Sequence, residues 1–131
     1  MEITDRSLYE YAVVRYVPRV DREEFINIGL VMMCKRLKWM RGAIHLHKDR
    51  ILAFDSATNM KLLEKQSSLF TRTDVPDPQL PVEEKYRWLT AVKSATLQVS
   101  PSHPGLLGID IEPTAESLNK EFERLMTQLV L

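Results

Sequence analysis

The sequence contains one cysteine, Cys34, so a single chain can form neither an internal disulfide nor a cysteine-rich zinc site. This favours a reducing compartment, and we expect a cytoplasmic protein. The longest apolar run, residues 28–34, is far shorter than the roughly 20 residues that span a bilayer. The opening segment, Met1–Arg6, is polar and leads into no apolar core, which predicts no secretory signal peptide. We therefore expect no contact with a membrane.

Other familiar signatures are missing as well. The glycines of residues 104–108 are not followed by a lysine and do not lie between a strand and a helix, so they form no phosphate-binding loop. The sequence has no repeat and no low-complexity tract. Its hydrophobic share of 44% and charged share of 27% are typical of globular proteins. The length of 131 residues then predicts one domain over residues 1–131.

Charge is balanced over the whole chain but unevenly distributed along it. Residues 35–72 contain nine basic and three acidic residues, whereas the segments on either side are acidic. A basic middle segment is compatible with binding to a nucleic acid or an acidic partner. The ordinary interpretation, solvated faces that keep a neutral protein in solution, stays open.

Three segments are typical of β-strands because they are rich in aromatic and β-branched residues. They cover residues 8–17, residues 25–34 and, after a basic turn, residue 39 to about residue 47. The short connections predict antiparallel neighbours, with a helical turn in the polar segment 19–24. Residues 96–99 are a candidate for a short fourth strand at the edge.

After the predicted strands, the apolar residues recur at helical spacing. Thr58 is the predicted cap of a helix that reaches Phe70, and a second helix is expected over residues 82–95. Its inward side chains would be Tyr86, Leu89 and Val92. Thr114 is the predicted cap of a last helix, whose apolar stripe consists of Leu118, Phe122, Leu125, Leu129 and Val130. Residues 74–81 and 100–113 are expected to be irregular. The predicted fold class is α+β, a three-stranded antiparallel sheet with about three helices packed on one face.

Strand register decides which side chains share a face. Placing Leu30 opposite Ile44, and Val14 opposite Ile28, gathers aliphatic side chains on the face that the helices cover. Arg15, Asn27 and His47 then form a row on the other face, at steps of about 5 Å. A guanidinium, an amide and an imidazole suit a carboxylate or a phosphate.

Two plainer interpretations of that face remain open. It is simply the wet side of the sheet, with Arg15 paired to Glu23 or Glu24, or it is a homodimer surface formed by Tyr9 and Tyr11. Gly29 and Asn27 are both locally unfavourable in a strand, which predicts a β-bulge or a close approach of another group to the sheet.

The sequence offers little for catalysis. His45 and His47 lie two residues apart and point the same way, but a third metal ligand is missing, because Cys34 lies far along the sheet. Glu23 and Glu24 are adjacent and point in different directions, so they do not resemble a paired acid and base. We predict no metal site, no cofactor and no catalytic residue, and we favour a protein that is not an enzyme.

Nucleic-acid binding has one candidate surface. Trp39 could stack on a base while Arg36, Lys38 and Arg41 contact phosphates. A tryptophan at a hairpin turn, however, also packs commonly on its neighbours or on a partner protein. Cys34 is interpreted as a packed core residue rather than a nucleophile.

The run from Tyr11 to Pro18 and the run from Arg22 to Val31 resemble the bacterial domain-of-unknown-function family numbered 3037. The specific part of the likeness lies around Arg15, Glu24, Asn27 and Gly29. The resemblance implies a bacterial cytosolic origin. Genes of this family often lie beside genes for HipA-like kinases, which implies an accessory or antitoxin-like role.

Three functions follow, in order of preference. The first is a non-catalytic module that binds a protein partner such as a HipA-like kinase. The second is an enzyme or sensor that binds an anionic ligand, and the third is nucleic-acid binding through residues 35–72. The candidate binding residues for the first two are Arg15, Arg22, Glu24, Asn27, Gly29, His45 and His47.

Overall fold

The three expected strands form the centre of an antiparallel sheet: β1 (Leu8–Tyr16), β2 (Ile26–Cys34) and β3 (Trp39–Ile44). The connection between β1 and β2 covers residues 17–25 and contains the expected helical turn, η2 (Val20–Arg22), while a turn at residues 35–38 joins β2 to β3. This computed structural model describes residues 8–108 and 111–131. The prediction about a signal peptide concerns Met1–Arg6, which lie outside the described residues.

Two further strands complete the sheet, β4 (Leu97–Val99) and β5 (His103–Leu106). Both pair with the edge of β1 that β2 leaves free, so the order is β3-β2-β1-β4 with β5 beside β1 as well. The buried Ser100 lies between β4 and β5 and forms hydrogen bonds to Val13 of β1. Its Oγ accepts the Val13 N–H at 2.9 Å, and its own N–H donates to the Val13 carbonyl at 2.9 Å.

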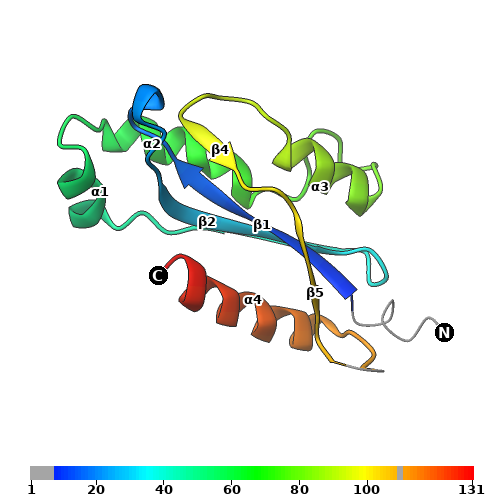
Figure 1. Ribbon diagram of the computed structural model, residues 1–131. Coiled ribbons are helices and arrows are strands. Elements are labelled where there is room, and N and C mark those ends of the chain that lie inside the picture. Colours follow the sequence, from blue (N-terminus) through cyan, green and yellow to red (C-terminus); the bar gives the residue numbers. More distant parts are fainter. Residues whose placement is uncertain (1–7, 109–110) are drawn as a thin grey trace.

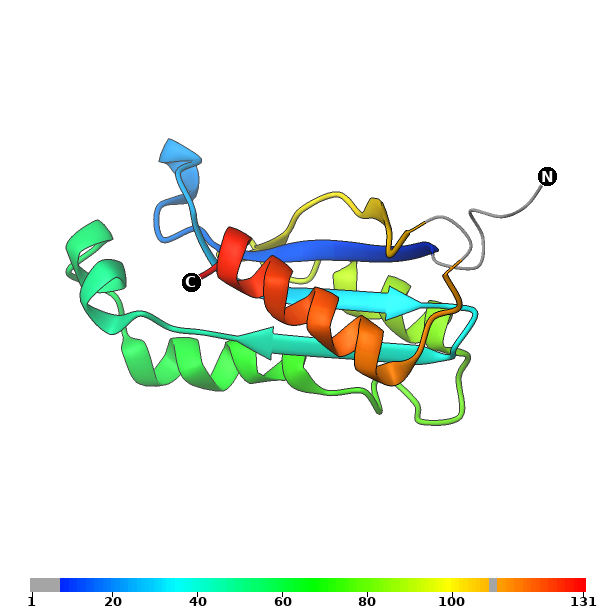
Figure 2. The same ribbon diagram turned by 90° about the horizontal axis from the view of Figure 1, so that it is seen from below.

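Helices cover both faces of this sheet (Figures 1 and 2). One layer contains α1 (Lys48–Phe54), α2 (Met60–Ser67), η3 (Ser68–Thr71) and α3 (Val82–Thr90), while α4 (Ala115–Leu129) crosses the opposite face. The α+β class with an antiparallel sheet is confirmed, but the described sheet has five strands. The prediction that helices cover only one face is wrong. The near-continuous apolar sequence of β2 explains why, since such strands are buried on both sides.

The sheet therefore separates two apolar cores. On one side Val14, Ile28 and Val31 pack against the layer of α1 to α3, whereas Leu30 and Met32 pack against α4 on the other. Leu118, Phe122, Leu125 and Val130 of the predicted stripe on α4 are buried, and Leu129 is half-buried. Within residues 8–108 and 111–131, no helix combines the length and apolarity needed to cross a bilayer.

Several element boundaries differ from the expectations. Asn59, not Thr58, caps α2, because its side chain accepts the Leu62 N–H at 3.1 Å. α3 ends at Thr90, which leaves Val92 97% exposed rather than inward. α1 and β5 were not predicted. Thr114 does cap α4, through a capping box with Ser117.

The predicted registers were wrong by one residue over most of the two hairpins. Val14 pairs with Gly29, and Leu30 pairs with Ala43. The predicted pairing is nevertheless correct beside the loop that joins β1 to β2, where Arg15 lies opposite Asn27 and Tyr16 opposite Ile26. A β-bulge between these regions explains the change, because Ile28 has no partner on β1.

Candidate functional site

The bulge at Ile28 changes which face each residue of β2 occupies. Before it, Asn27 points to the α4 side and Ile26 to the opposite core. After it, Leu30 and Met32 point to the α4 side. Strict alternation from Leu30 would have placed Asn27 in the other core. The extra residue therefore puts an amide directly beside Arg15 of β1.

Gly29 follows the bulge and lies where β3 comes very near. A Cβ at this position would stand 2.7 Å from the Ala43 carbonyl oxygen and 2.4 Å from the Ile44 Cδ1. Both expectations for this glycine, a bulge and a close approach, are confirmed. The group that approaches is the neighbouring strand.

A polar row does cross three strands, but His47 is not its third member. Arg15 pairs with Asn27 of β2 on one side and with Gln98 of β4 on the other. The row lies on the face that α4 crosses, and the Asn27 Nδ2 donates to the Leu129 carbonyl at the end of α4, at 3.0 Å. The expectation of a helix-free face carrying the row was therefore wrong.

Two polar atoms in this row lack partners. The Arg15 Nε and the Asn27 Oδ1 are both buried, and neither has a hydrogen-bond partner among the described residues. The guanidinium instead lies over the ring of Phe25, with 4.2 Å from Cζ to the ring centroid, and Phe25 is 45% exposed. The pairing of Arg15 with Glu23 or Glu24 does not occur, since Glu24 binds Arg22 at 2.7 Å. A buried donor and a buried acceptor without partners lower the stability of the fold. Such groups in a native structure need an explanation, and a binding site is one.

Arg22 and Glu24 line a groove of about 490 Å³ at the same end of the sheet, where β1 ends and β2 begins. Its other walls come from the end of α1 and the chain after β1. The complete lining is Pro18, Arg19, Arg22, Glu24, Ala53, Phe54, Asp55 and Ser56. Phe54 is 40% exposed. We call Arg15, Arg22, Glu24, Phe25, Asn27 and Phe54 the bulge-end surface.

The two histidines follow β3 at this same end of the sheet, beside the start of β2. The His45 N–H donates to the Ile28 carbonyl at 2.7 Å and so continues the ladder, while His47 caps α1 by accepting the Arg50 N–H at 3.2 Å. Their ring centroids are 6.4 Å apart. No group of three His, Cys, Asp or Glu that could hold a metal ion occurs in the described part of the chain.

Three of the four proposed nucleic-acid residues already have partners within the chain. Arg36 forms two hydrogen bonds with Glu112, at 3.1 and 3.3 Å, and Arg41 binds Glu123 at 2.8 Å. Trp39 is half-buried and packs on the α4 side of the sheet. The Lys38 side chain has no hydrogen bond or ion pair within the described residues. The free positive charge is therefore smaller than the sequence suggests.

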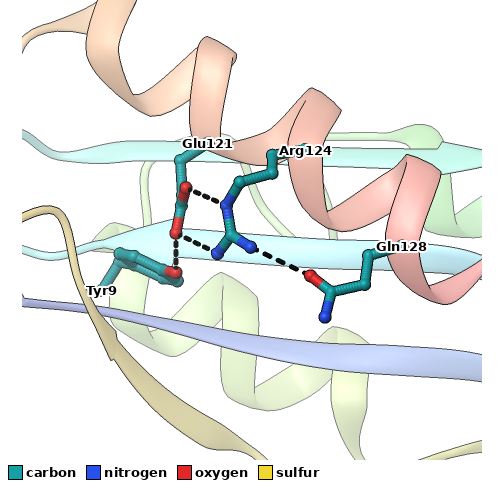
Figure 3. Close-up of polar contacts among 4 residues, drawn as sticks. All are labelled: Tyr9, Glu121, Arg124 and Gln128. Atoms are coloured by element: carbon teal, nitrogen blue, oxygen red, sulfur yellow. Dashed lines mark hydrogen bonds and ion pairs between the residues drawn. The ribbon is translucent and has the colours of Figure 1, made fainter.

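Tyr9 is not available as a dimer surface, because it is buried beneath α4. Its hydroxyl donates to Glu121, whose carboxylate also accepts two hydrogen bonds from Arg124 at 2.8 Å, and Arg124 reaches Gln128 at 2.9 Å (Figure 3). Burial and then the hydrogen bond to Glu121 raise the pKa of Tyr9, while Arg124 lowers the pKa of Glu121. This cluster attaches α4 to β1.

The fold and the site define a small α+β domain whose antiparallel sheet lies between two helical layers, with a partly unsatisfied polar row at the end of α4. The sequence model of the family described as "Protein of unknown function (DUF3037)" matches residues 11–130. The chain belongs to this family. Searches of curated proteins and of solved structures gave no match.

Proposed function

We propose that this domain is a non-catalytic module that binds a protein partner through the bulge-end surface. The observation that carries the proposal is the state of Arg15, a cation that stacks on the half-exposed Phe25 and forms no ion pair with any described residue. Arginine and aromatic side chains are the types that dominate the energy of protein interfaces.

The chemistry of the surface defines what such a partner should present. The Arg15 guanidinium suits a carboxylate, and the Asn27 Oδ1 still needs a donor. The adjacent groove combines the apolar Phe54 with Arg19 and Arg22. An acidic residue of the partner would suit the Arg15 guanidinium, whereas Arg22 is already paired with Glu24 and Arg19 with Asp21. A HipA-like kinase remains the proposed partner.

The test separates binding from folding. Replacing Arg15 by Met keeps the aliphatic stem on Phe25 and removes the buried Nε that has no acceptor. We expect Arg15→Met to change the free energy of unfolding by less than about 0.5 kcal/mol, because no intramolecular ion pair is lost. Phe54→Ala should likewise leave the fold intact.

Each of these variants should weaken the complex with a HipA-like kinase from the same genome by about ten-fold or more in isothermal titration calorimetry. Val92→Ala is the matched control, since Val92 is also exposed and apolar but lies after α3. The proposal fails if wild-type chain and kinase elute separately in size-exclusion chromatography. It also fails if Arg15→Met and Phe54→Ala bind as tightly as Val92→Ala.

A further inference from the structure

A second hollow lies at the opposite end of the sheet from the bulge-end surface, beside the turn between β2 and β3. Its volume is about 740 Å³, within the range of roughly 300–1,000 Å³ that is common for small-molecule sites. Its lining residues are Lys35, Lys38, Trp39, Met40, Thr73, Gln79, Leu80, Pro81, Val82, Glu83 and Lys85. We call this hollow the lysine pocket.

The lysine pocket carries an excess of positive charge. Of its three lysines, Lys35 binds Glu83 at 3.4 Å. The pKa of Glu83 is lowered, first by a hydrogen bond from its own backbone N–H and then by Lys35, so this carboxylate stays ionised and neutralises Lys35. The side chains of Lys38 and Lys85 form no hydrogen bond or ion pair within the described residues. Two cations are thus left facing a hollow.

Lys38 occupies a backbone position that a lysine does not favour. Its φ is 52°, in the left-handed region where glycine and asparagine are the usual residues. The turn is closed by a hydrogen bond from the Lys38 N–H to the Lys35 carbonyl at 3.1 Å. Strained backbone positions cluster at ligand-binding and other functional sites, which supports a binding role for Lys38.

Uncharged groups complete the lining. Thr73 and Gln79 contribute polar side chains, and Trp39 borders the hollow although its ring packs on the α4 side of the sheet. The first turn of α3, a helix of nine residues without a side-chain cap, borders the same hollow. Glu83 and Glu84 in this first turn already offset the positive end of the helix.

We propose that the lysine pocket binds a phosphorylated small molecule, with its phosphate held by Lys38 and Lys85 and its remainder beside Trp39. Lysine ammonium groups are strong donors to phosphate oxygens. The site shares no residue with the bulge-end surface, so it would give the domain a ligand-dependent input in addition to partner binding.

The test begins with the unmodified chain. In ¹⁵N–¹H correlation spectra, pyrophosphate and ATP should shift the amide signals of residues 35–40 and 79–85 in a saturable way, whereas adenosine alone should not. Pyrophosphate and ATP should both shift the signals near Lys38 and Lys85 if phosphate is the recognised group, and ATP should in addition shift the indole signal of Trp39. Saturable shifts confined to other regions would overturn the proposal, as would no saturable shift at all.

Variants then identify the residues. In a Trp88→Phe background, quenching of Trp39 fluorescence by ATP reports binding. Lys38→Gly and Lys85→Gln should each weaken ATP binding by about ten-fold or more. Lys38→Gly should also raise the melting temperature, because glycine relieves the left-handed strain, so a loss of binding would not arise from unfolding. Lys61→Gln, on the exposed side of α2, is the matched control and should bind as the wild type does.

One competing outcome is a polynucleotide surface. A single-stranded oligonucleotide whose binding depends on Lys38 and Lys85, and which saturating pyrophosphate does not displace, would replace the small-molecule proposal. Equal ATP affinity in Lys38→Gly, Lys85→Gln and Lys61→Gln would refute the assignment of the phosphate to these lysines.

Discussion

The side chain of Asn27 and the carbonyl of Leu129 are 102 residues apart in the sequence and joined by a hydrogen bond of 3.0 Å. This bond attaches the last turn of α4 to β2. Tyr9 attaches the middle of the helix to β1 through Glu121, and Arg41 attaches it to β3 through Asn119 and Glu123. α4 is therefore fastened to each of the three central strands, and its position depends on all three contacts.

Replacing Asn27 by Ala should release the end of α4 without unfolding the chain. We expect a loss of about 1 kcal/mol, the net contribution of one hydrogen bond, together with faster hydrogen exchange in the last turn of the helix. Urea denaturation and exchange measured by mass spectrometry check the two effects. Gln98→Ala, which changes the same polar row without touching α4, should leave the exchange of α4 unchanged.

Removing the hydroxyl of Tyr9 should cost more. This hydroxyl is bound to an ionised carboxylate in a partly buried place, so Tyr9→Phe should lower the free energy of unfolding by about 1.5–3 kcal/mol. Tyr11→Phe is the control, because the Tyr11 hydroxyl forms no hydrogen bond with a described residue. Equal denaturation midpoints for the two variants would contradict a role for the Tyr9 bond.

The Glu121 cluster also predicts a pH dependence. The folded-state pKa of Glu121 lies below its ordinary value of 4.5, so its contribution to stability is present above that value and is lost as the pH falls through the folded-state pKa. The stability difference between the wild type and Glu121→Gln should therefore narrow as the pH is lowered below about 4.5. Chemical denaturation at a series of pH values measures it. A difference that stays constant down to acid pH would show that the charge of Glu121 does not matter.

A side chain at position 29 should not fit. Gly29→Ala would place a methyl group 2.7 Å from the Ala43 carbonyl oxygen, and we expect a cost of about 2 kcal/mol from the displaced strand. The added methyl would also meet the Ile44 Cδ1, which Ile44→Val removes. The double variant should stay destabilised relative to Ile44→Val alone, because the backbone oxygen remains. Full recovery in thermal denaturation would assign the clash to Ile44 instead.

The features predicted correctly from the sequence are those that depend on residues close together in the chain. The strands were found because β-branched and aromatic residues concentrate in them, and α4 was found because Thr114 precedes a regular apolar stripe. β5 was missed because Pro104 and Gly105 are typical of loops, although a short edge strand tolerates both. α1 was missed because His47 is not a usual capping residue.

Non-local pairing accounts for the remaining differences. Arg15 and Asn27 were correctly paired, but the bulge at Ile28 moved every pair beyond it, and a bulge cannot be located from alternation alone. The third member of the row, Gln98, was missed because nothing in the sequence places β4 beside Arg15. The lysine pocket combines residues 35–40 with residues 73–85, and only the packing of α3 brings them together.

The bridge at Ser100 has a consequence for the way this sheet opens. β1 is held along one edge by a single long strand and along the other by two short ones, which meet where a serine hydroxyl takes the place of a backbone carbonyl. The pairing of β4 with β1 and the pairing of β5 with β1 can therefore break independently. If β5 separates from β1, the start of β1 loses its partner on that edge. The segment around Arg15 remains paired with β2 and β4.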